Sequence, residues 1–278
     1  MRTKFLLPIF VFGIFLTSCE KEDVPSETDE FLLDQEDQIS KEDLKAIADL
    51  HFNNKDAKIV DFLFPDGSTE KTFLLEGDIV MNPDQLKEMY SGNITSKQYR
   101  TYNLVYSPRN VNVIGFTGGG GQGLTTKQRS ALQSAIANYN ALNIGLNFTL
   151  TFGTNYTPYD IVVYQNSNGQ AGGVAGFPSG GNPYKYVQIF SGMENYSTST
   201  NEHVITHEIG HAVGLRHTDW YSRQSCGQSG EAADPSGAVH IPGTPTGYDS
   251  NSVMLACFSA SEDGNFGYYD RVALEYLY

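Results

Sequence analysis

One stretch of the chain, residues 206–219, carries the sequence THEIGHAVGLRHTD and decides both the fold and the chemistry that we expect. His207 and His211 are four residues apart, so on a helix their imidazoles lie one above the other and reach one metal ion. Gly214 lets the helix end in a turn, because glycine adopts positive φ without a Cβ penalty. The returning chain then brings His217 to the same ion. We therefore predict a metal centre held by His207, His211 and His217.

This set of ligands favours zinc. Three neutral imidazoles with an open fourth position are typical of a catalytic zinc site, whereas structural sites are closed by four ligands and favour cysteine. Glu208 lies beside the two helical histidines but not on their face. We predict that it is the general base, which takes a proton from a metal-activated water and passes it to the leaving amine of a cleaved peptide.

Three further side chains near this stretch are candidates for supporting roles. His203 extends the same helical face, but about 6 Å of rise per four residues puts it beyond the ion, so we expect core packing or hydrogen bonding there. His240 faces the cleft or the solvent. Asp219 holds a ligand imidazole or a turn by hydrogen bonding, or is an exposed turn residue.

Residues 207–217 match in full the His-Glu-x-x-His-x-x-Gly-x-x-His motif of the metzincin clan. With the loop 241–245 and the segment 252–254, the chain resembles the bacterial dual-action HEIGH metallopeptidases from about residue 101 to 258, and more loosely at 76–80. The resemblance implies an α/β (α+β) fold of the metzincin-like zincin type. It has a small twisted mixed sheet, an active-site helix and a Met-turn at Met254, and a small α+β region precedes it. It also implies a zinc endopeptidase that cleaves protein or peptide substrates.

The chain departs from this pattern in two places. Some metzincins have a tyrosine two residues after the methionine, but this chain has Ala256, so the group that stabilises the oxyanion beside zinc stays unassigned. Several relatives are kept latent by a cysteine of the propeptide, but the only upstream cysteine here is Cys19. Any latency would therefore use a carboxylate or steric blockage. The resemblance also places the substrate on an edge strand, for which we expect residues 174–190.

The N-terminus resembles a bacterial lipoprotein signal. Arg2 and Lys4 precede an apolar run at 5–16, which is too short to span a bilayer comfortably, and Cys19 follows. We predict removal of 1–18 and a lipid anchor on Cys19. An ordinary secretory signal is the alternative.

The acidic run Glu-Lys-Glu-Asp at 20–23 resembles an export signal of Bacteroides-type lipoproteins. We expect a lipoprotein of the bacterial outer membrane, exposed at the cell surface. A periplasm-facing or secreted protein is the alternative.

Charge divides the chain into regions. The net charge of −14 excludes a nucleic-acid partner, because phosphate binding needs surplus Lys and Arg. Residues 20–99 contain 20 acidic and 8 basic side chains, whereas 101–278 contain 12 and 7. We predict an acidic tether at 19–39, a small N-terminal domain or propeptide at 40–100, and a zinc metallopeptidase domain at 101–278. Arg100 is a candidate processing point, and we expect a monomer.

The local pattern predicts further elements. We expect a helix capped by Ser40, a hairpin around 65–67, a second helix at 83–90, and a helix over 125–142 among several strands. In an oxidising compartment Cys226 and Cys257 read as a disulfide, with two free thiols as the alternative.

A protein of another class stays open as the alternative function. It is a non-catalytic, zinc-stabilised surface adhesin or glycan-binding lipoprotein. Glu208 argues against it, because a structural zinc has no use for a base.

Overall fold

The computed structural model describes residues 38–91, 100–101, 103–228 and 240–278. The predicted signal peptide, Cys19 and nearly all of the predicted tether lie outside the described residues. Residues 38–278 form one compact unit. None of the helices in the described ranges has the length and apolar character needed to cross a membrane.

The N-terminal region, 38–91, is a small α+β layer, as the sequence pattern predicts. Helix α2 (Lys41–Asp49) begins where the Ser40 hydroxyl accepts a hydrogen bond from the Asp43 amide. Strands β1 (Lys58–Leu63), β2 (Thr69–Leu75) and β3 (Ile79–Met81) form an antiparallel sheet, and α3 (Pro83–Ser91) follows. Their apolar side chains share a core to which Phe177 of the following region contributes: Ile47, Leu75, Ile79, Met81 and Leu86.

A second sheet has five strands in the order β5-β4-β6-β8-β7. Strands β4 (Arg109–Phe116), β5 (Leu146–Gly153), β6 (Ile161–Asn166) and β8 (Tyr186–Phe190) run parallel, whereas β7 (Gly173–Val174) pairs antiparallel with β8. The edge strands are therefore β5 on one side and β7 on the other. Our expectation of an edge strand over 174–190 was wrong for its second half, because β8 is hydrogen-bonded on both sides.

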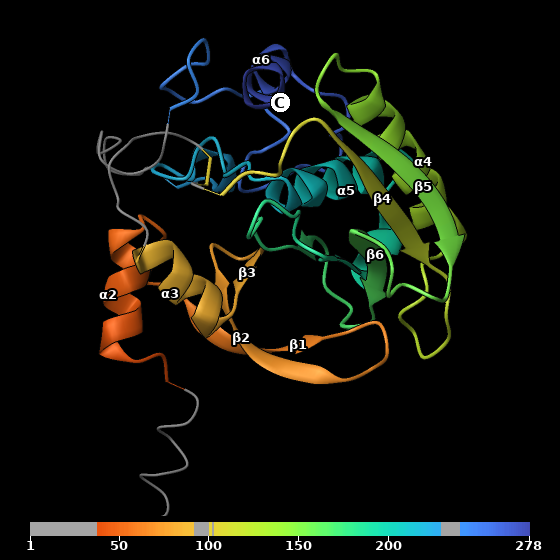
Figure 1. Cartoon of the computed structure of the whole chain (residues 1–278), viewed down its shortest axis with the longest axis horizontal. Helices are drawn as coiled ribbons and strands as arrows, with labels where there is room; N and C mark the ends of the chain where they lie inside the picture. The colour runs from red at the N-terminus through yellow and green to blue at the C-terminus, as the bar shows by residue number, and fades with distance from the viewer. Residues whose placement is uncertain (1–37, 92–99, 102, 229–239) are drawn as a thin grey trace, which may run out of the picture. The chain divides into compact units, whose positions relative to one another are not determined.

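Two helices cover one face of this sheet (Figure 1). Helix α4 (Thr126–Asn140) starts with a capping box between Thr125 and Gln128, and α5 (Thr198–Ala212) starts at the Ser197 cap. Short 3-10 turns, η1 (Ser191–Asn195) and η2 (Gln224–Cys226), and the C-terminal helix α6 (Tyr268–Leu277) complete the elements described. The fold is the predicted mixed α/β arrangement, with small sheets and a helix, α5, that carries the first part of the histidine motif.

The N-terminal sheet packs on the opposite face of the five-stranded sheet. Phe62 and Phe64, at the end of β1 and just after it, contact Tyr186 edge-on. The Tyr164 hydroxyl donates to the Leu63 carbonyl at 2.6 Å. The region upstream of residue 100 is thus joined to the rest by a packed interface.

Candidate metal centre

Helix α5 and the turn after it bring three histidines together, as the sequence predicts. His207 and His211 lie on α5, and Gly214, at φ 109°, turns the chain back toward the helix. The Nε2 atoms of His211 and His217 are then 3.2 Å apart. Among the described residues, one group of side chains could hold a metal ion. It consists of the three histidines and Asp78 of the N-terminal region.

The spacing of the four ligand atoms fits zinc. Bonds of about 2.0–2.1 Å to a tetrahedral ion place neighbouring ligand atoms roughly 3.3–3.4 Å apart. Asp78 Oδ2 is 3.0 Å from His217 Nε2 and 3.4 Å from His207 Nε2. Nε2 of His207 is buried, and no group within the described ranges forms a hydrogen bond with it, as expected of a metal ligand.

Each imidazole is oriented through its other nitrogen. Nδ1 of His207 lies 2.8 Å from the Val253 carbonyl, and Nδ1 of His211 lies 2.8 Å from the Leu215 carbonyl. Nδ1 of His217 lies 2.9 Å from Glu76 Oε2. Such partners leave Nε2 of each ring directed into the cluster and raise its basicity as a ligand.

The predicted Met-turn lies beneath the cluster. Met254 is buried, and a Cβ at Gly210 of α5 would stand 2.5 Å from its sulfur, so helix and turn are in close contact. The turn is held by Asp270 of α6, whose carboxylate accepts hydrogen bonds from the Ser252 hydroxyl and the Val253 amide. The sequence does not predict this role of Asp270, because no motif links helix α6 to the segment that contains Ser252 and Val253.

Asp219 joins the end of the zinc motif to the Met-turn. Its carboxylate accepts from the Ser225 amide and hydroxyl and, at 2.9 Å, from the Ala256 amide. The expectation of a residue that holds a turn is confirmed, whereas that of an exposed residue was wrong, since Asp219 is fully buried. Cys226 and Cys257, on either side of this connection, form a disulfide.

Glu208 faces the cavity beside the cluster. The cavity has a volume of about 300 Å³. Its walls are the tip of the N-terminal segment at 76–78, the loop that leads into β7 at 170–173, helix α5 and the residues after Met254. Glu208 is 2% exposed, and none of the residues that the structure describes forms a hydrogen bond with its Oε2. Burial, and then the charge of Asp78, raise the pKa of Glu208 well above its ordinary range.

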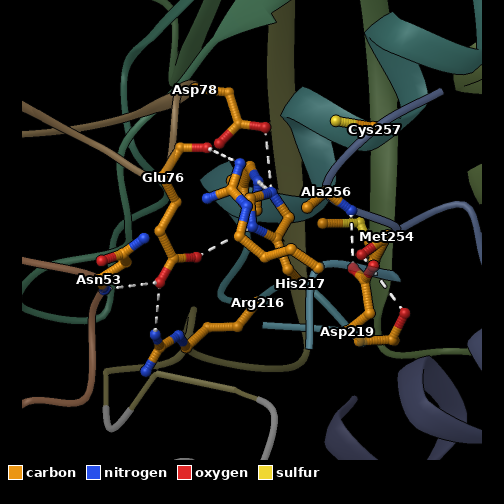
Figure 2. A network of polar contacts seen from close by, with 12 residues as sticks. Asn53, Glu76, Asp78, Arg216, His217, Asp219, Met254, Ala256 and Cys257 are labelled. Atoms are coloured by element: carbon orange, nitrogen blue, oxygen red, sulfur yellow. Dashed lines mark hydrogen bonds and ion pairs between the residues drawn. The ribbon is translucent and has the colours of Figure 1, made fainter. Parts of the chain in front are cut away.

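Asp78 and Glu76 reach the histidines from the N-terminal region (Figure 2). Both side chains serve the cluster because the chain turns sharply between them, with Glu76 at φ 54° and Gly77 at φ 97°. Burial raises the pKa of Asp78, but the neighbouring imidazoles outweigh it and hold that pKa well below its usual range. Burial lowers the pKa of His217, but the carboxylates of Asp78 and Glu76 raise it to about 10.

The sequence pattern did not reveal these two carboxylates as site residues. The segment Glu-Gly-Asp at 76–78 offers acidic side chains around a glycine, but the resemblance to the HEIGH metallopeptidases is loose there. The segment lies more than 120 residues before the zinc motif, so the sequence does not show that the two are close in space.

The remaining candidates lie outside the ligand set. His203 is buried, with Nδ1 2.9 Å from the Asp263 carbonyl, and burial lowers its pKa. His240 is half-buried, and its Nε2 lies 2.5 Å from the Thr244 carbonyl. Arg100 forms a β-bridge with Leu215, and the Thr101 amide donates to the Gly214 carbonyl at 2.9 Å.

The mixed α/β fold and a cluster of four potential metal ligands, two of them on α5, are features of a metallopeptidase. The family model of the dual-action HEIGH metallo-peptidases matches residues 73–278, and the chain belongs to this family. Membership implies zinc as the metal and a protein or peptide as the substrate. The match begins within β2 and therefore includes Glu76 and Asp78.

Two solved structures of myroilysin are similar to the chain. The match to the first is 15% identical and covers 63% of this chain and 82% of the myroilysin chain, with a TM-score of 0.40. The match to the second is 14% identical and covers 70% of this chain and 95% of the myroilysin chain, with a TM-score of 0.38. No curated protein sequence matches.

Proposed function

We propose that the chain is the latent form of a zinc endopeptidase, in which Asp78 occupies the fourth coordination position. The observation that carries this proposal is the placement of Asp78 Oδ2 at 3.0 Å from His217 Nε2 and 3.4 Å from His207 Nε2. A catalytic zinc needs that position for water or substrate, so a carboxylate there blocks turnover.

Backbone contacts support the same proposal. The Val80 amide donates to the Ala175 carbonyl at 2.8 Å, and the Ala175 amide donates to the Asp78 carbonyl at 3.0 Å. Residues 78–80 thus add themselves beyond the β7 edge strand, where an extended peptide would dock by strand addition. The N-terminal segment blocks both the metal and the groove.

Activity then requires residues 78–80 to leave the groove, by proteolysis or by displacement. The peptide bond between Arg100 and Thr101 takes part in the contacts to Gly214 and Leu215, and Thr101 is buried. An initial cut after Arg100 would need those contacts to open first. We therefore expect the first cut at a more exposed bond nearer the N-terminus.

In the open enzyme, Glu208 is the general base. His207, His211 and His217 would hold zinc, which would supply the polarisation of the attacking water and of the substrate carbonyl. Departure of Asp78 removes a negative charge that helps to raise the pKa of Glu208, so more of the ionised form becomes available to take a proton from the attacking water. Glu208 then delivers that proton to the leaving amine, and its position on the cavity wall suits both transfers.

We also propose that the protein is attached to the bacterial outer membrane through Cys19, facing the outside. The support is the sequence alone: a short apolar run that ends at Cys19, followed by an acidic segment. Metabolic labelling with an alkyne fatty acid, compared with Cys19→Ala, tests the anchor. Protease accessibility on intact cells tests the orientation.

One observation favours the second candidate, a non-catalytic zinc-stabilised protein. Four protein ligands close the site, as in structural zinc centres. Against it stands Glu208, a buried carboxylate with an oxygen that no described group satisfies.

Casein hydrolysis by the full chain, before and after limited trypsin treatment, decides between these candidates. The latent peptidase gains chelator-sensitive activity on processing, and N-terminal sequencing finds the new end. A zinc protein that stays inactive in every processed form, with its metal bound, would support the structural alternative.

A further inference from the structure

Arg216, the residue before the third histidine, is a buried cation. It is 4% exposed. Its Nη atoms donate to the Leu50 carbonyl at 3.2 Å, to the His51 carbonyl at 2.8 Å and to Glu76 Oε1 at 3.4 Å. Its guanidinium lies 3.9 Å from the centre of the Phe52 ring. These partners all belong to the N-terminal region, so that region covers Arg216.

Glu76 connects this cation to the metal cluster. Its Oε1 accepts from Arg216 and from the Asn53 amide, while its Oε2 lies 2.9 Å from His217 Nδ1. The carboxylate of Glu76 therefore bridges the guanidinium of Arg216 and the outer nitrogen of a zinc ligand (Figure 2).

The Arg216 guanidinium also contacts a side chain of the peptidase part of the chain. The Trp220 ring lies 5.8 Å from the Arg216 guanidinium, and Trp220 belongs to the same post-helix segment. A second cation, Arg223, donates to the Glu76 carbonyl at 2.9 Å and lines the cavity beside the cluster. When the N-terminal region leaves, two cations and Nδ1 of His217 remain at this place.

We propose that Arg216 and His217 Nδ1 form a carboxylate-binding subsite, occupied in the latent chain by Glu76, which selects substrates with an acidic side chain next to the scissile bond. The proposal rests on the proposed function. An arginine stays charged at any working pH, and its planar fork matches a carboxylate. A substrate carboxylate that replaces Glu76 can make the same contacts to Arg216 and His217, whereas a neutral side chain cannot form the charge-assisted pair.

The position of the subsite follows from the segment that fills it. Asp78 lies at the metal, and Glu76 is two residues away on the same strand-forming segment. A peptide that docks in the same groove presents the equivalent side chain within one or two residues of the bond at the metal.

The first arm of the test uses the full chain and no catalysis. Glu76→Ala opens a carboxylate-sized space beside Arg216, and acetate is the probe. Acetate should raise the Tm of this variant saturably by about 2 °C or more over sodium chloride of equal ionic strength. Wild type and the Glu76→Ala/Arg216→Gln double variant should show no such difference. Equal shifts in single and double variants would overturn the subsite.

The second arm uses processed enzyme and a pair of peptides that differ only by Glu or Gln near the cleaved bond. Wild type should prefer the Glu peptide by about tenfold in kcat/KM. Arg216→Gln should bring that ratio close to one, while the exposed Arg271→Gln on α6 should keep it. A ratio near one in wild type, or an unchanged ratio in Arg216→Gln, would overturn the proposal. Because this arm does not use Glu76→Ala, it still tests the proposal should that variant fail to fold.

The two arms separate the inference from the function beneath it. Saturable acetate binding without hydrolysis of either peptide would leave the subsite standing and remove the peptidase proposal. Hydrolysis of both peptides without a preference for Glu would support the peptidase proposal and overturn the subsite.

Discussion

Asp78 Oδ2 lies 3.0 Å from Nε2 of His217, although the two residues are 139 positions apart in the chain. The contact places a carboxylate of the N-terminal region where a catalytic zinc needs an open position. In the function that we propose, the N-terminal region thereby contributes the group that closes the centre.

Replacement of this carboxylate should weaken latency. In Asp78→Ala the three imidazoles remain, so we expect one zinc per chain and casein hydrolysis by the unprocessed protein at least about tenfold above wild type, since loss of about 1.4 kcal/mol shifts such an equilibrium tenfold. The exposed Asp84→Ala on α3 is the control and should behave as wild type. Unchanged latency together with an unchanged visible spectrum of the cobalt-substituted protein would rule out Asp78 as a ligand.

Removal of the proposed base should separate binding of zinc from catalysis. Glu208→Gln keeps the size of the side chain but cannot take a proton, so processed enzyme should lose about 10²- to 10⁴-fold in kcat. Zinc content by mass spectrometry should stay at the wild-type level, because the ligands are unchanged. Glu275→Gln, exposed on α6, is the matched control. A processed Glu208→Gln enzyme with near wild-type kcat would remove Glu208 from the mechanism.

The zinc motif and much of the fold were predictable because their information is local. Spacing of four residues puts two histidines on one helix face, and glycine permits the turn that follows. Ser40, Thr125 and the turn at 65–67 likewise act on their immediate neighbours, and the corresponding elements lie close to the predicted bounds.

The contributions of Asp78, Glu76 and Asp270 were not predictable, because each depends on packing between distant segments. Asp78 and Glu76 act only where the N-terminal sheet docks against the post-helix loop. The register of that docking depends on surfaces of both partners, which a single sequence pattern does not encode. The edge strand was misplaced for the same reason, since strand order in a sheet is a non-local property.

Loss of the Asp270 carboxylate should destabilise the Met-turn. Asp270 accepts hydrogen bonds from the Ser252 hydroxyl and the amides of Val253 and Gly267 at 2.7, 2.8 and 2.9 Å. Asparagine has one acceptor oxygen for these donors, so Asp270→Asn should lower the free energy of unfolding by about 2–3 kcal/mol. Urea unfolding monitored by circular dichroism measures this, with Glu275→Gln on the same helix as the control. A loss below about 0.5 kcal/mol would contradict this role.

Zinc binding should weaken in the same Asp270→Asn variant. The Val253 amide donates to Asp270, and the Val253 carbonyl lies 2.8 Å from Nδ1 of His207, so the carboxylate fixes the peptide unit that orients a ligand. Loss of such a supporting partner typically costs about 10- to 100-fold in metal affinity. Competition with a chromogenic chelator measures the change, and an affinity equal to wild type would show that Val253 is held by other contacts.

Buried His203 should make stability depend on pH in the weakly acidic range. Burial lowers its pKa below 6.5, so the unfolded chain takes up this proton before the folded chain does. The stabilising contribution of the neutral ring is fully present above about pH 6.5 and is lost as the pH falls toward the lowered folded pKa. In His203→Gln, which can still donate to the Asp263 carbonyl, the free energy of unfolding should fall less steeply below pH 6.5. The slopes should differ by up to about 1.4 kcal/mol per pH unit. Urea titrations from pH 7.5 to 5 measure both slopes, and parallel curves would show that His203 takes up its proton equally in the folded and unfolded chains.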